Sequence, residues 1–190
     1  MASEIDICSA ALLSLGAQTI SSFDESTDRA RLCANMWPLV RDEVLRGHPW
    51  NCAIKRDVLA ALAADPAYDY AYQYQLPADW LRTLSVGEYG REPDFKIEGR
   101  RILSDETPLK IRYVFRNEDA QTYDSLLTNV MVAAMAARIA YATTQSASLE
   151  QVKQQELQMI LKRARAVDGM EEPPETFGDF PLLASRHGNF

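Results

Sequence analysis

The chain has 190 residues, of which 47% are hydrophobic and 25% are charged, and its formal net charge is -7 at pH 7. This length suits one domain, or one domain with a small insertion, and the composition is typical of a soluble globular protein. The net negative charge argues against a protein that binds nucleic acid through a general basic surface, although it is compatible with one that lets nucleic acid pass without binding it.

The three cysteines, Cys8, Cys33 and Cys52, lie in apolar neighbourhoods and share no short spacing. This pattern predicts buried free thiols and a reducing compartment. Residues 1–6 lack the basic stretch and apolar run of a signal peptide. We therefore expect a soluble protein made in the cytosol.

Two helices are predicted in the first 50 residues. Ser3 is a good N-cap for the first, and Gly16 supplies a left-handed stop at its end. The second helix begins near Ser26 or Thr27 and runs to Gly47, with apolar residues at helical spacing along one face.

The middle third has the alternation typical of strands. Tyr68, Tyr70, Tyr72 and Tyr74 alternate, which predicts four rings on one face of a strand. Further strands are expected at residues 81–86, at 95–98 and 101–104 around a Gly99 hairpin, and at 109–116, where one face is basic. These segments predict one small antiparallel sheet of four or five strands.

A long apolar helix is predicted at residues 122–142, and the rest of the chain is organised around it. Its apolar residues occur on nearly every side, which indicates a helix buried all round. Charged, Thr and Asn residues interrupt it, so it falls short as a membrane span. Its many alanines allow neighbouring helices to approach closely.

The last helix is predicted to begin at a capping box formed by Ser148 and Gln151 and to end at Gly169. Residues 170–190 contain Pro173-Pro174, Pro181 and two glycines, so a regular helix is excluded there. This segment nevertheless carries apolar residues that a polar disordered tail would lack. We interpret it as an extended arm that becomes ordered on a partner through Phe177, Phe180, Leu182 and Leu183.

Together these elements predict an α+β protein: a four-helix bundle with an inserted small antiparallel β-sheet lobe and an extended C-terminal arm. The expected divisions are residues 1–50 for the first two helices, 51–118 for the β-rich lobe, 119–169 for the last two helices, and 170–190 for the arm.

No motif in the chain predicts catalysis, a metal site or a cofactor. The only histidines are His48, which we expect to interact with the last carbonyls of the second helix, and His187, in the arm. Cys33, His48 and Cys52 lack the spacing of metal ligands, and the glycines form no phosphate loop. Acidic pairs occur in turns, where Asp is expected for local reasons.

A basic cluster in the β-rich third leaves two interpretations open. It can be the solvated face of an amphipathic sheet, or a contact to an acidic protein surface or to phosphates. The tyrosine stripe likewise fits sheet core or a platform for stacking bases. The cluster comprises Lys96, Arg100, Arg101, Lys110, Arg112 and Arg116.

An ordered series of segments resembles a known family. It runs from ALLSLGAQTISSFDE at residues 11–25 through ARLC at 30–33 and VRDEVLRGHPWN at 40–51. It continues with YQYQLPADWLR at 72–82, IEGRRIL at 97–103 and IRY at 111–113. The series is similar to tail tubular protein A, the head-to-tail adaptor (gatekeeper) family of tailed bacteriophages, over nearly all of residues 3–169.

The resemblance implies a homo-oligomeric ring, usually of twelve subunits, docked between the portal protein and the tail nozzle protein, with DNA passing through. It implies a helical bundle, a β-rich lobe and an arm that reaches the portal, and no catalytic residue, cofactor or membrane. The protein would reside at the head-tail junction of the virion after synthesis in the host cytoplasm. Candidate contacts to a neighbouring subunit or to the nozzle are Arg100, Arg101, Arg112 and Arg116.

Two other classes of function are compatible with the sequence. One is a virion-associated lytic or nucleic-acid-processing enzyme with catalytic acids that carry no motif. The other is a small regulator that binds DNA through Arg100 and Arg101.

Overall fold

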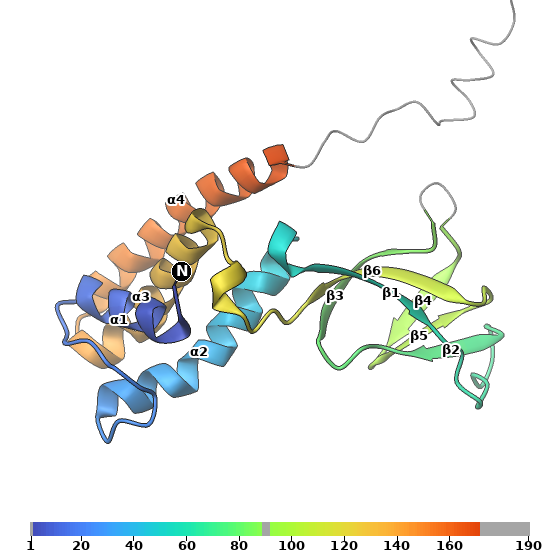
Figure 1. Ribbon diagram of the computed structural model, residues 1–190, viewed down its shortest axis with the longest axis horizontal. Helices are drawn as coiled ribbons and strands as arrows, with labels where there is room; N and C mark the ends of the chain where they lie inside the picture. The colour runs from blue at the N-terminus through green and yellow to red at the C-terminus, as the bar shows by residue number, and fades with distance from the viewer. Residues whose placement is uncertain (1, 89–91, 172–190) are drawn as a thin grey trace, which may run out of the picture.

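The computed structural model describes residues 2–88 and 92–171, and the structural statements below concern these residues. The chain is α+β, with four α-helices and two small antiparallel sheets. The helices gather at one end of an elongated molecule and the strands at the other (Figure 1).

The first two helices begin where the sequence predicts. α1 (Glu4–Ser14) has a capping box in which the Asp6 backbone N–H donates to the Ser3 hydroxyl, at 3.1 Å, and the Asp6 carboxylate accepts from the Ser3 N–H. α2 (Asp28–Gly47) is capped by Thr27. The predicted stop is confirmed at Gly16, whose φ of +76° is a conformation that favours glycine.

The central helix, α3 (Ser125–Thr144), is buried on most sides, as predicted. The Asp124 side chain caps it by accepting from the Leu127 N–H at 2.6 Å. By length and composition α3 could cross a membrane, with a mean hydropathy of 1.4, but 56% of that apolar window is buried inside the chain. A soluble core helix passes the same test, so the pattern is weak support for a membrane span. The buried residues are Leu127, Val130, Met131, Ala133, Ala134, Met135, Ala136, Ala137, Ile139 and Ala140.

The prediction of a four-helix bundle with one inserted sheet is wrong. In such a bundle each helix packs against two neighbours around a shared core. Here α1, α2 and α4 (Ala147–Glu171) each pack mainly on α3, contact between α1 and α2 is slight, and α4 has no extensive contact with either. The cause lies in α4, which buries only Ala164 and Asp168 along 25 residues and therefore offers an apolar face wide enough for one partner.

The predicted start of the last helix is also displaced. Ser146, and not Ser148, caps α4: its hydroxyl accepts from the Leu149 N–H at 3.3 Å. Gln145, in the left-handed conformation at φ 56°, turns the chain from α3 into α4. The connection is therefore short, and α3 and α4 lie against each other along their lengths (Figure 1).

Six strands form two three-stranded sheets, whereas the sequence predicted a single sheet of four or five strands. Sheet A has the order β1-β6-β3 and sheet B the order β2-β5-β4, and all neighbours are antiparallel. Sheet A consists of β1 (Ile54–Leu59), β6 (Leu109–Phe115) and β3 (Trp80–Val86). Sheet B consists of β2 (Tyr72–Gln75), β5 (Arg101–Ser104) and β4 (Phe95–Glu98).

The predicted strand with four tyrosine rings on one face is wrong in its first half. β2 begins only at Tyr72, because Asp69 takes φ 71° and breaks the extended run. Tyr68 is 77% exposed, whereas Tyr74 is fully buried between the sheets. The buried ring belongs to the sheet core, and the stripe does not form a stacking platform.

Two separate apolar cores hold the molecule together. The larger one surrounds α3 and includes Leu81 and Val114 at the near end of sheet A. The smaller one lies between the two sheets and is built from both, with Tyr74 and Ile102 facing Ile111 and Tyr113. Because Val114 and Tyr113 are consecutive, β6 places alternate side chains in the two cores.

Candidate interaction surfaces

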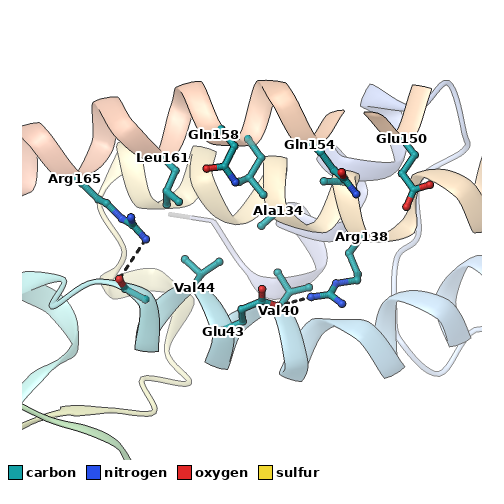
Figure 2. A pocket seen from close by; sticks show the side chains of 13 residues that line it. Val40, Glu43, Val44, Ala134, Arg138, Glu150, Gln154, Gln158, Leu161 and Arg165 are labelled. Atoms are coloured by element: carbon teal, nitrogen blue, oxygen red, sulfur yellow. Dashed lines mark hydrogen bonds and ion pairs between the residues drawn. The ribbon is translucent and has the colours of Figure 1, made fainter. Parts of the chain in front are cut away.

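An open groove runs along the helical part, with α2 and α4 as its sides and α3 as its floor (Figure 2). It exists because α4 packs on α3 and leaves α2 uncovered on that side. Its cavity volume is about 500 Å³. The apolar lining is Val40, Val44, Ala134, Ala137, Leu157 and Leu161.

Polar side chains form the rim of this groove. Glu43 of α2 and Arg138 of α3 form an ion pair across it. Further along, Arg165 of α4 donates from Nη2 to the Gly47 carbonyl at 3.2 Å (Figure 2). A Cβ at Gly47 would lie 3.3 Å from that nitrogen, so a larger residue would disturb the contact. An apolar floor inside a polar rim is the usual composition of a protein-protein contact.

The four predicted arginines do not form one cluster. Arg100 and Arg101 lie at the β4–β5 hairpin of sheet B, in the part of the molecule that the strands form. Arg100 donates to the Pro77 carbonyl, and Arg101 donates from Nη1 to Gln73 Oε1 at 2.8 Å. Both side chains remain on an exposed edge and are available to a partner.

Arg116 forms an ion pair within the chain. Its Nε donates to Asp42 Oδ2 at 2.8 Å, which ties the end of sheet A to α2. The other oxygen of the Asp42 carboxylate accepts from Arg41 Nε at 2.9 Å, and Arg41 is only 7% exposed. The structure thus places Arg116 at the junction between helices and sheets.

Arg112 lies on the outer face of sheet A beside an arginine that sequence reasoning missed. Arg56 of β1 is the direct antiparallel neighbour of Arg112 of β6. Both line a cavity of about 760 Å³ on the part of this face that the helices leave open. Arg56 was missed because β1 has no alternation of apolar and polar residues: its sequence IKRDVL is exposed or half-buried until Leu59. Only the register with β6 brings the two guanidinium groups together.

His48 has a role that differs from the predicted one. Its Nε2 lies 2.9 Å from Asp168 Oδ2 of α4, where the sequence predicted interaction with the carbonyls of α2. The same carboxylate accepts from the Asn51 backbone N–H at 3.3 Å, and Asp168 is 5% exposed. The Trp50 ring packs edge-on to His48, with centroids 4.6 Å apart. These contacts fasten the last turns of α4 to the segment that enters sheet A.

The cysteines are free, and Cys8 and Cys33 are buried as predicted, whereas Cys52 is half-buried. Burial, with added repulsion from Asp124 and Asp168, raises the pKa of the Cys52 thiol to about 11, so this group is a poor nucleophile at neutral pH. Within residues 2–88 and 92–171 no group of three His, Cys, Asp or Glu side chains is arranged to hold a metal ion. The predicted portal contacts Phe177, Phe180, Leu182 and Leu183 lie outside the described residues.

No protein-family model matches the chain, and no curated protein sequence is significantly similar to it.

Proposed function

We propose that this chain is a structural subunit of a tailed-bacteriophage virion: a head-to-tail adaptor that assembles into a ring between the portal protein and the tail nozzle protein. The ordered series of segments over residues 3–169 motivates the proposal. The observation that carries it is the distribution of open surface: an elongated molecule with an open groove along its helices and, at its other end, an uncovered sheet face lined by both basic and acidic side chains.

These two surfaces suit a subunit with neighbours on more than one side. The groove lies between α2 and α4, and the same helices also carry exposed apolar side chains outside it, among them Leu39 at 61% and Met159 at 68% exposed. A monomer rarely exposes a large contiguous apolar patch without a partner. The arm, through Phe177, Phe180, Leu182 and Leu183, is proposed to bind the portal.

DNA passes through the ring in this proposal without being held. Each phosphate that a protein neutralises adds binding free energy, which would slow transit. A net charge of -7 on every subunit opposes such retention.

Native mass spectrometry of the chain, with and without the portal protein, tests the proposal. A closed ring of many copies, alone or on the portal, is the expected result. A chain that remains monomeric in both samples would contradict the adaptor role. Hydrolysis of peptidoglycan or DNA by the purified chain would favour an enzyme, and salt-dependent duplex binding would favour a regulator.

A further inference from the structure

The outer face of α4 carries an apolar stripe that stays exposed in the described part of the chain. Val152 is 55% exposed, Met159 68% and Met170 82%, and Ala166 is exposed as well. Steps of seven, seven and four residues separate these four positions, so they follow one another along a single face of the helix. A stripe of this kind on the outside of a helix indicates a contact with another protein.

The stripe lies between the two cavities that α4 lines. On one side, Glu150, Gln154 and Leu161 line the open groove between α2 and α4 (Figure 2). On the other side, Glu156 and Arg163 line a smaller cavity, of about 240 Å³, that α1 and α3 also border. None of the four stripe residues lines either cavity. Glu156 and Arg163 therefore share one flank of the stripe.

The stripe and its charged flank are arranged evenly about the middle of α4. Met159 is the central residue of this 25-residue helix. Val152 lies seven positions before it and Ala166 seven after, while Glu156 lies three before and Arg163 four after. A second α4 laid antiparallel and centred on Met159 thus places Val152 against Ala166 and Glu156 against Arg163. Two-fold symmetry makes each of these contacts occur twice.

The charges favour this antiparallel direction. Arg163 forms no hydrogen bond or ion pair with another described residue, so its guanidinium group is free to bind a carboxylate. Glu156 binds Lys153 through Oε2 at 2.9 Å, and its side chain is 43% exposed, which leaves the other carboxylate oxygen for a second cation. A parallel pair would place Glu156 against Glu156 and Arg163 against Arg163, where like charges repel.

The size of the contact predicts a weak association. With a rise of about 1.5 Å per residue and a width of about 10–12 Å, the 25 residues of α4 present a footprint of about 400 Å² on each copy. Stable interfaces bury about 1,200–2,000 Å² in total. A pair of α4 helices lies below that range, so we expect it to form and dissociate with concentration.

We propose that the outer face of α4 binds α4 of a second copy of this chain, antiparallel about a two-fold axis at Met159. This contact goes beyond the proposed ring and does not rest on it. A two-fold contact uses the same surface on both copies and closes at two, whereas a cyclic ring joins different surfaces of successive subunits. The pair is therefore a state of the free chain, in which the apolar stripe is covered.

Disulfide trapping tests the register in the full-length chain with Cys52 changed to Ser. Met159→Cys should give a disulfide-linked pair with oxidised glutathione, because the two copies of residue 159 meet at the axis, within the Cα separation of about 4.4–6.8 Å that a disulfide needs. Val152→Cys is the matched control: it is exposed on the same stripe, but its two copies lie about 21 Å apart along the helices. A mixture of Val152→Cys and Ala166→Cys chains should restore the crosslink.

Charge reversal tests the flank. Sedimentation over a range of concentrations, without the portal protein, measures the association. Arg163→Glu and Glu156→Arg should each weaken it by about tenfold, because each change sets like charges against each other twice in the pair. E156R/R163E restores opposite charges and should return to within about threefold of the wild type. Glu150→Arg, an equal change in charge on the groove side of α4, should associate as the wild type does, and thermal unfolding confirms that each variant is folded.

Met159→Cys chains that crosslink no faster than Val152→Cys chains overturn the inference, as does a charge-swapped double variant as weak as its parents. Efficient crosslinking of Val152→Cys alone shows a parallel pair and overturns the antiparallel contact. Binding of the wild type to phosphatidylserine vesicles that is lost in Met159→Asp assigns the stripe to a lipid surface and overturns the pair. The adaptor role stands in each case, because ring formation on the portal protein is measured separately. A chain that pairs through α4 but forms no ring contradicts the adaptor role and leaves this contact standing.

Discussion

The contact between Asp168 and the segment after α2 predicts the effect of one substitution. Asp168 is almost fully buried, and its carboxylate accepts hydrogen bonds from His48 Nε2 at 2.9 Å and from the Asn51 N–H at 3.3 Å. Asp168→Ala removes the only acceptor that either donor has among the described residues. His48 is half-buried and Asn51 is exposed, so water can replace part of these contacts.

The magnitude follows from these two bonds. A hydrogen bond to a charged group contributes about 1.5–3 kcal/mol, and a buried donor left without a partner costs about 1–3 kcal/mol. The His48 side chain is 18% exposed, so water recovers part of that loss. We expect Asp168→Ala to lower the free energy of unfolding by about 2–4 kcal/mol, a large part of the roughly 5–15 kcal/mol typical of a domain.

Urea unfolding followed by tryptophan fluorescence measures this change, because Trp50 packs against His48. His48→Gln is the informative comparison: a glutamine amide can still donate to Asp168, so this variant should lose less than about 1 kcal/mol and should retain ring assembly. Glu150→Ala, a carboxylate removed from the first turn of the same helix, should change stability by less than about 0.5–1 kcal/mol. A midpoint for Asp168→Ala equal to that of the wild type would show that the Asp168 contacts do not stabilise the fold.

A substitution, a chemical modification and a deletion test other parts of the molecule. Met131→Asp places an unpaired charge in the core around α3 and should unfold the chain. Tyr141→Asp is the control, because that side chain is 50% exposed on the same helix, and this variant should remain folded. A soluble Met131→Asp variant with an unchanged melting temperature would contradict the burial of the helix. Alkylation of Cys52 at pH 8, followed by peptide mass spectrometry, should be about 100-fold slower than alkylation of a thiol with the ordinary pKa of 9.0. The rate should rise with pH until about pH 11, because the raised pKa keeps the thiol protonated below that value. A rate that is flat above pH 9 would contradict the raised pKa of Cys52. Deletion of residues 171–190 should leave the rest of the chain folded and abolish stable docking onto the portal protein, so equal portal affinity of the two forms would contradict the proposed arm contact.

The sequence predicts the helices well because their determinants are local. Ser3, Thr27 and Asp124 cap α1, α2 and α3 through bonds to residues three positions ahead, and such bonds need no tertiary context. The all-round apolar pattern of α3 correctly predicts its central position. The arrangement of the other helices depends on how much apolar surface α4 offers, and the spacing of its apolar residues does not reveal that most of them are only partly covered.

The strands and the arginine pair show where sequence reasoning fails. The left-handed Asp69 ends the tyrosine alternation, although nothing around it in the sequence requires that conformation. β1 is an edge strand with exposed residues, so its pairing with β6 is set by tertiary contact. Arg56 and Arg112 are 56 positions apart, and only the register between those strands makes them neighbours.

The position of α3 in the sequence determines the order in which the two cores can be completed on the ribosome. All six strands lie within residues 54–115, so the core between the sheets can close before α3 has been synthesised. α1 and α2 must wait for α3, with Cys33, Trp37 and Val40 uncovered in the meantime. At about 5–20 residues per second, the interval between Gly47 and Ser125 lasts on the order of 4–16 s. Chaperone demand during synthesis should therefore fall on the N-terminal helices, and a circular permutant that begins with α3 and α4 would transfer it to the faces of α3 that α1 and α2 cover.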